Sequence, residues 1–244
     1  MRPVILCSLL ILSFHRINAQ GVAKEPAPVP RGASQMSVLV DPYWKSGTAM
    51  AGLSWETYTG VTGSMFYNED WAKGWVLLSD NRIARDIPLR YNVYTNQIYF
   101  KLDSTVRVID PSVPVKEFGL EMQKDDPGKK TIFRSGYPGS GKNTVNTFYE
   151  LIAGGRLSLL KHDTRRIVER NNLSTGPEKI FTDTETWYVY DSTDQKMTEI
   201  RRNRSALLEA LPRYGKNIQA VIGEKGLKLK GDQDWIILFT ELNK

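Results

Sequence analysis

Hydrophobic and polar positions alternate with a period of two through residues 71–110, which read as a series of strands. Short polar turns at Asp80-Asn81 and Thr95-Asn96 separate the strands, and Asn and Asp tolerate the left-handed backbone that tight turns need. The longest apolar series is Ile83, Ile87, Leu89, Tyr91 and Val93. Arg85 is the one exception in that series. An apolar face and a polar face joined by tight turns predict an antiparallel meander.

Further strands are expected after this meander. The candidate segments are 115–122, 130–134, 148–153, 156–162, 185–190 and 196–200. Gly154-Gly155 suits the turn of a two-residue hairpin, and residues 171–178 read as a loop. Pro88 donates no amide hydrogen, so we expect it at a sheet edge or a bulge.

From Asn203 the apolar period lengthens to that of a helix. Asn203 and Asp232 are candidate N-caps, and Pro212 ends one helix or begins the next. Helices this short need a surface to pack on. The predicted fold class is therefore α+β. An antiparallel β domain over residues 36–202, built as a meander or sandwich or a partly open barrel, carries a C-terminal helical segment over residues 203–244.

The N-terminus has the features of a signal peptide. Arg2 precedes an apolar stretch over residues 4–14, and Ala19 is a small residue suited to cleavage. This stretch is shorter than the roughly 20 residues that cross a bilayer, and no later segment is apolar enough, so no transmembrane segment is expected. We predict a signal peptide over residues 1–19, a flexible Pro/Ala-rich linker over residues 20–35, and export to the periplasm or the extracellular space.

Cysteine and histidine are scarce, which limits the chemistry available. Cys7 is the only cysteine and lies in the expected signal peptide, so the exported chain would have no disulfide, thiolate nucleophile or lipidated cysteine. His162 would be its one histidine, which we interpret as a polar residue at a strand end rather than a catalytic group. No cofactor or metal is expected. A net charge of +6 is too small to indicate nucleic-acid binding.

Residues 136–144 approach the spacing of a phosphate-binding loop through Gly136, Gly141 and Lys142. That loop needs Ser or Thr after the lysine, and Asn143 stands there instead. It should also join a strand to a helix, whereas the following residues predict a strand. We interpret the segment as a turn rich in Gly and Pro.

Several acidic residues could form the two-carboxylate site of a glycoside hydrolase. The candidate pairs are Glu69 with Asp70, Asp125 with Asp126, Asp183 with Glu185, and Glu117 with Glu121. Most of them lie in expected turns, where carboxylates are common because water solvates them. A hydrolase is therefore the alternative function and not the leading one.

Aromatic residues gather in the N-terminal part of the chain. Trp44, Trp55, Tyr58, Tyr67 and Trp71 form a candidate surface for a ligand or partner. Exposed rings of this kind suit sugars, whereas buried rings would simply fill a strand-rich core. Both interpretations stay open at the level of sequence.

Three parts of the chain carry a resemblance. They are residues 67–71, 74–76 and 86–92, with the segment PLRYN; residues 148–152 and 155–160; and residues 206–212 and 226–230. Together they resemble uncharacterised exported proteins of Bacteroidota, a β-rich family with short C-terminal helices. The resemblance implies an exported β-rich protein and supplies no catalytic residue.

These observations lead to one functional expectation with one alternative. We expect a non-enzymatic exported protein of the cell envelope that binds a protein partner or a small apolar or glycan ligand. The alternative is a periplasmic hydrolase that cleaves glycosides with carboxylates. No nucleic-acid partner is expected in either case.

Overall fold

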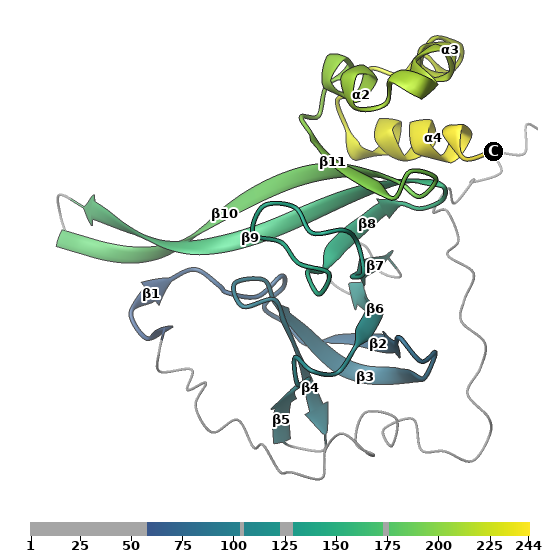
Figure 1. The fold of residues 1–244 in the computed structure, drawn as a ribbon. Coiled ribbons are helices and arrows are strands. Elements are labelled where there is room, and N and C mark those ends of the chain that lie inside the picture. Colours follow the sequence, from purple (N-terminus) through teal and green to yellow (C-terminus); the bar gives the residue numbers. More distant parts are fainter. Residues whose placement is uncertain (1–57, 103–104, 123–128, 173–175) are drawn as a thin grey trace, which may run out of the picture.

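The computed structural model describes residues 58–102, 105–122, 129–172 and 176–244, which form one open, mainly antiparallel sheet with three short C-terminal helices (Figure 1). The strands are β1 Val61–Thr62, β2 Ala72–Leu78, β3 Ile83–Asn92, β4 Gln97–Leu102, β5 Thr105–Val108, β6 Val115–Met122, β7 Lys129–Arg134, β8 Tyr149–Ala153, β9 Leu157–Asn172, β10 Gly176–Asp191 and β11 Lys196–Ile200. The α+β class predicted from the sequence is confirmed. Several predictions concern residues outside the described part of the chain: the signal peptide 1–19, the linker 20–35, Trp44, Trp55 and the pair Asp125-Asp126.

The strands follow a simple order across the sheet. It runs β1-β10-β9-β8-β7-β6-β2-β3-β4-β5, and β11 also pairs with β10. Every pairing is antiparallel except that of β1 with β10. Most neighbours in the sheet are also neighbours in sequence, as short hairpin connections allow.

The predicted meander is confirmed as β2 to β5, and a bulge explains its one irregular position. The pairing of β2 with β3 shifts register between Gly74 and Val76, and Asp86 there has a φ of 57°. The bulge breaks the alternation at Arg85 and turns Ala84 into the core instead of toward water. Pro88 pairs with β2 only, because pairing of β3 with β4 begins at Leu89. The expected edge position of Pro88 is thus confirmed.

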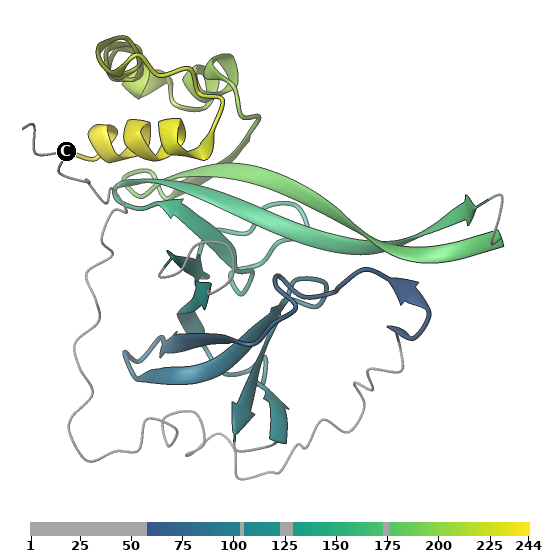
Figure 2. The same ribbon diagram turned by 180° about the vertical axis from the view of Figure 1, so that it is seen from behind.

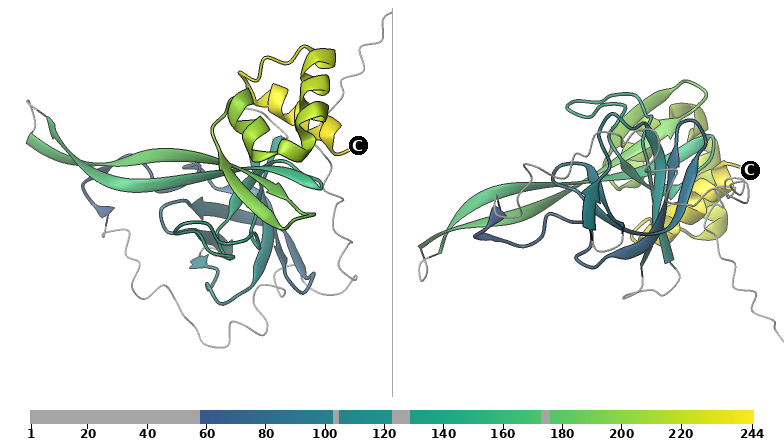
Figure 3. Two further views of the ribbon diagram at one scale, coloured as in Figure 1. Left: turned by 45° about the horizontal axis from the view of Figure 1, so that its top comes forward. Right: turned by 90° about the horizontal axis from the view of Figure 1, so that it is seen from below.

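Strands β9 and β10 form a hairpin of 16 residues each, which projects from the body as a twisted ribbon (Figures 2 and 3). The expected strands 156–162 and 185–190 were too short, and residues 171–172 and 176–178 of the expected loop belong to β9 and β10. His162 consequently lies within β9 and not at a strand end. We refer to residues 163–172 and 176–185 as the arm.

The C-terminal residues form α2 Arg204–Ala210, the short 3-10 helix η2 Pro212–Tyr214, α3 Gly215–Lys225 and α4 Asp232–Leu242. The Asn203 side chain caps α2 by accepting the amide hydrogen of Ala206 at 2.9 Å, as predicted. The expected cap at Asp232 was wrong. Gly231 occupies the N-cap, and the Asp232 carboxylate accepts a hydrogen bond from Arg202 instead.

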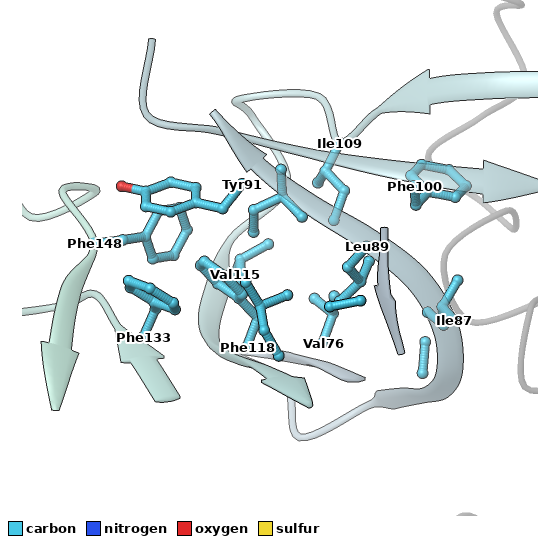
Figure 4. Close-up of a cluster of buried hydrophobic side chains, with 14 of the residues drawn as sticks. Val76, Ile87, Leu89, Tyr91, Phe100, Ile109, Val115, Phe118, Phe133 and Phe148 are labelled. Carbon is cyan, nitrogen blue, oxygen red and sulfur yellow. The ribbon is translucent and has the colours of Figure 1, made fainter. Parts of the chain in front are cut away.

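Two apolar clusters and a polar strip share one face of the sheet. In-register pairing places Phe133, Glu150, Lys161, Trp187 and Ile200 in one row across β7 to β11. Phe133 belongs to the first cluster, which fills the meander half of the molecule (Figure 4). Trp187 and Ile200 belong to the second cluster, which the three helices cover. Glu150 and Lys161 lie between the two. No helix within the described residues is long and apolar enough to cross a membrane.

Candidate functional site

A cavity of about 180 Å³ opens at the edge of the meander cluster, and its walls come from three separate segments of the chain. The lining residues are Thr95, Asn96, Gln97, Ile98, Ile109, Asp110, Pro111, Val113, Val115, Asn146 and Phe148. Ile109, Val115 and Phe148 supply apolar walls and are drawn in Figure 4. Ile98, Pro111 and Val113 add further apolar surface, and the other lining side chains carry amide, hydroxyl and carboxylate groups. The cavity therefore combines an apolar surface with hydrogen-bonding groups.

Asn96 holds the polar side of this cavity together. Its φ of 56° belongs to the turn between β3 and β4. Its side-chain Oδ1 accepts the Tyr91 hydroxyl hydrogen at 2.9 Å and the Phe148 amide hydrogen at 3.2 Å. Its Nδ2 donates to the Asn146 carbonyl at 3.0 Å. These bonds fasten the segment before β8 to the turn, so the two walls are fixed in place before any ligand arrives.

Two polar atoms of residues that line the cavity have no hydrogen-bond partner among the described residues. Gln97 Oε1 and Thr95 Oγ1 are buried and make no hydrogen bond with any described residue. Leaving such a group unsatisfied costs about 1–3 kcal/mol. Neither oxygen exposes surface to the cavity, so a ligand would reach them only after the Thr95 or Gln97 side chain turns toward it.

Asp110 adds a negative charge at the rim. Its Oδ1 accepts hydrogen bonds from the Ser112 hydroxyl at 2.6 Å and the Ser112 amide at 2.8 Å. These bonds stabilise the charged form, so they lower the pKa of the Asp110 carboxyl. The carboxylate is ionised at neutral pH and can only accept hydrogen bonds from a ligand.

A second polar site lies in the strip between the two apolar clusters. Lys161 Nζ is 2.7 Å from Glu150 Oε2 and 3.3 Å from Asp163 Oδ2. The Tyr67 hydroxyl donates to Glu150 Oε2 at 3.2 Å. We call these four residues the lysine cluster. One ammonium thus binds two carboxylates, and all four side chains are largely shielded from water.

The ionisation of this cluster follows from burial and charge. Burial opposes the charge on Lys161, but the nearby Glu150 and Asp163 outweigh it and raise the lysine pKa. Burial raises the pKa of Asp163 although Lys161 acts in the opposite direction. Burial and the charge of Glu150 raise the pKa of Tyr67. Lys161 is therefore a fixed cation and is poorly suited to act as a nucleophile.

The predicted aromatic surface is distributed over separate places. Tyr58 packs against Tyr94 with ring centres 5.5 Å apart, and both rings contact Phe181 of the arm. Tyr67 packs on Phe133 and joins the lysine cluster. Trp71 lies beneath Lys101, with the ammonium 4.6 Å from its ring centre. The rings are thus used in different packing contacts instead of one shared platform.

Glu69 and Asp70 are both exposed, and two other predicted carboxylate pairs are separated by their partners. Glu117 binds Arg134, and Glu121 lies 3.5 Å from Lys130. Asp183 binds Arg165 across the arm, whereas Glu185 accepts the indole hydrogen of Trp187. Glu150 and Asp163, which the sequence patterns did not single out, are the carboxylates that share a partner. Sequence reasoning missed them because they lie on different strands.

The glycine-rich segment 136–144 is a loop between the antiparallel strands β7 and β8. It covers the opposite face of the sheet, where Asn143 Nδ2 lies 3.3 Å from His162 Nδ1. Burial lowers the pKa of His162 to about 4, so the ring is neutral at physiological pH. This arrangement is a packed loop over a buried histidine and lacks the strand-to-helix context of a phosphate site.

Comparison with known proteins adds no functional information: no family model, curated protein or solved structure matches this chain. The functional interpretation of the cavity and of the lysine cluster therefore depends on their geometry alone.

Proposed function

We propose that this chain is a non-enzymatic exported protein of the cell envelope that binds a small hydroxylated ring in the cavity beside Gln97. A terminal sugar unit of a glycan is the ligand class that fits best. The observation that carries this proposal is the mixed lining of the cavity, which combines the apolar side chains of Ile98, Ile109 and Phe148 with polar residues such as Gln97 and Asp110.

The size of the cavity supports a single ring. A cavity of about 150 Å³ is known to hold one benzene ring, and this one measures about 180 Å³. A pyranose is a six-membered ring with an apolar face and a rim of hydroxyl groups. The apolar face would lie on Ile98, Ile109 and Phe148.

The polar groups complement such a rim. Hydroxyl groups can donate hydrogen bonds to the Asp110 carboxylate, and to Gln97 Oε1 and Thr95 Oγ1 once these side chains turn toward the cavity. A purely apolar ring would displace water from the polar lining groups without replacing its hydrogen bonds, at about 1–3 kcal/mol for each group left unsatisfied. A hydroxylated ligand is therefore favoured over an apolar one of the same size.

The test is titration of the ¹⁵N-labelled protein with free hexoses, N-acetylhexosamines and, as the apolar probe, phenol. We expect one of the sugars to shift the side-chain amide signals of Gln97 and Asn96. Gln97→Leu should abolish the shift at Asn96, while Gln219→Leu, an exposed change on α3, should leave it intact. Binding of phenol alone, or sugar binding that survives Gln97→Leu, would contradict the proposal.

The hydrolase alternative has one supporting observation, the two carboxylates of the lysine cluster. Its test is hydrolysis of p-nitrophenyl glycosides by the same protein. Turnover that Glu150→Gln removes and Gln97→Leu leaves intact would favour the hydrolase. We expect no turnover, because Lys161 occupies the position between the carboxylates where a scissile bond would need to lie.

A further inference from the structure

Beyond Lys161, no strand among the described residues pairs with one edge of β9. It pairs with β8 only as far as Lys161, which is opposite Glu150. From there to Asn172, the pairings of the described residues join β9 to β10 alone. Alternate residues of such an edge present unpaired backbone N–H and C=O groups, which are a template for another strand. The views in Figure 3 show the arm projecting from the body, with β1 beside β10.

We propose that this edge of β9 pairs with the same edge of a second copy of the chain, antiparallel and centred on Ile167. The two arms then form a four-stranded sheet. The symmetry of the pairing and the charges along this edge favour a second copy of the chain as the partner.

Symmetry limits the possible registers. Along an antiparallel ladder, hydrogen-bonded pairs alternate with non-hydrogen-bonded pairs. A two-fold axis perpendicular to the sheet that passed between two residues would exchange a pair of one type with a pair of the other type. The axis must therefore pass midway between a residue and its own copy in the second chain. The centre is therefore a single residue and never the midpoint between two. Centres at Arg166 and Glu169 place like charges opposite each other. A centre at Val168 places Arg166 opposite Arg170 of the partner subunit, twice.

A centre at Ile167 avoids every like-charge pair and creates opposite-charge pairs. Arg165 then faces Glu169 of the partner subunit, and Ile167 faces its own copy. Within each arm, Arg165 binds Asp183 at 2.7 Å and Glu169 lies 3.8 Å from Lys179. The four strands therefore carry an alternating row of Asp, Arg, Glu and Lys, repeated by the two-fold axis.

The remaining contacts in this register are also compatible. Cross-strand pairing joins Ile167 to Phe181 within each arm, so an apolar row crosses all four strands at the centre. On the other face, Thr164 lies opposite Arg170 of the partner subunit. Cross-strand pairs of these kinds stabilise a sheet by roughly 0.2–1 kcal/mol each.

The Arg165 side chain is held from the apolar-row face and not from the edge. Its guanidinium donates to the carbonyl oxygens of Ser64 and Phe66, whose segment crosses that face of the sheet. The arm is thereby braced against the body. A braced edge loses less conformational entropy on pairing than a free hairpin would.

The first experiment measures the oligomeric state of the chain by sedimentation velocity from low to high micromolar concentration. We expect a reversible monomer–dimer equilibrium. Glu169→Lys should weaken the dimer at least tenfold, because it faces Arg165 of the partner subunit with a like charge. Glu178→Lys is the matched control, since it makes the same charge change on β10 away from the pairing edge, and it should leave the dimer intact.

The second experiment tests the register by disulfide formation in a Cys7→Ser background. Residues paired directly across antiparallel strands have Cα atoms about 4.5–5.5 Å apart, within disulfide range. Ile167→Cys should therefore form a covalent dimer under mild oxidation. Val168→Cys should not, because its own copy lies diagonally, at roughly 7–8 Å. A monomer at all concentrations, or equal crosslinking at both positions, would overturn the proposal.

Discussion

His162 is a buried base whose environment makes stability depend on pH. Its pKa falls from 6.5 to about 4 because burial opposes the charged ring. Below pH 6.5 the unfolded chain takes up a proton that the folded chain does not, so stability falls as pH decreases toward 4. Between pH 7 and pH 5 this residue should cost about 2 kcal/mol. Urea unfolding at the two pH values measures the loss of stability. In His162→Gln, which retains an acceptor for Asn143, the loss between pH 7 and pH 5 should be smaller by about 2 kcal/mol.

Gly74 is required by a close approach of two strands. A Cβ at this position would lie 2.3 Å from the Gly119 carbonyl oxygen and 2.8 Å from Leu89 Cδ1. Backbone cannot move aside cheaply, so Gly74→Ala should lower the free energy of unfolding by about 3 kcal/mol. Gly223→Ala is the control, because its added methyl group meets no atom within 4 Å and α3 should gain up to about 1 kcal/mol. Equal melting temperatures for the two variants would disprove the clash.

At the scale of elements, Asn243 fastens α4 to the hairpin of β8 and β9. Its Oδ1 accepts the Leu157 amide hydrogen at 2.8 Å, and its Nδ2 donates to the Leu157 and Phe239 carbonyl oxygens, each at 2.8 Å. Asn243→Ala should cost about 2 kcal/mol and speed hydrogen exchange at the Leu157 amide. Asn203→Ala removes the cap of α2 and should cost about 1 kcal/mol without altering that amide. Unchanged protection of Leu157 would show that the helix is held by apolar packing alone.

The amino-acid pattern predicts a strand well where an apolar core buries one face of that strand. It predicts a strand poorly where neither face packs on an apolar core. Alternation identified β2 to β5 because the meander buries one side of each strand. It failed beyond His162, where Glu169 is exposed and Arg165 is covered by the carbonyl groups of Ser64 and Phe66 and not by an apolar core. Backbone pairing with β10 sustains that part of β9, and the amino-acid pattern carries little sign of it.

The cavity was missed for a different reason. Thr95 and Asn96 were read correctly as a turn, but residues 109–115 and 146–148 meet them only through tertiary packing. No spacing of residues within a single segment predicts that these segments lie together. The strongest sequence signal available was Gln97, a polar residue that begins a strand beside an apolar core.

At the scale of the whole molecule, the lysine cluster joins two apolar clusters that would otherwise be separate. Tyr67 comes from the segment that crosses the sheet, Glu150 from β8, and Lys161 and Asp163 from β9. Lys161 is the only cation in this group. Removing it leaves two shielded carboxylates facing each other without a counter-charge.

Lys161→Met should therefore lower the free energy of unfolding by about 3–5 kcal/mol, because a buried carboxylate without its partner is strongly unfavourable. The double variant Glu150→Leu/Lys161→Met removes the pair and fills the space with apolar groups, so it should cost less than Lys161→Met alone. Urea unfolding of Lys161→Met, Glu150→Leu and the double variant completes a double-mutant cycle. The cycle gives the free energy of interaction between Glu150 and Lys161. A loss below about 1 kcal/mol for Lys161→Met would mean that water already solvates the cluster. The two halves would then be joined by backbone pairing alone.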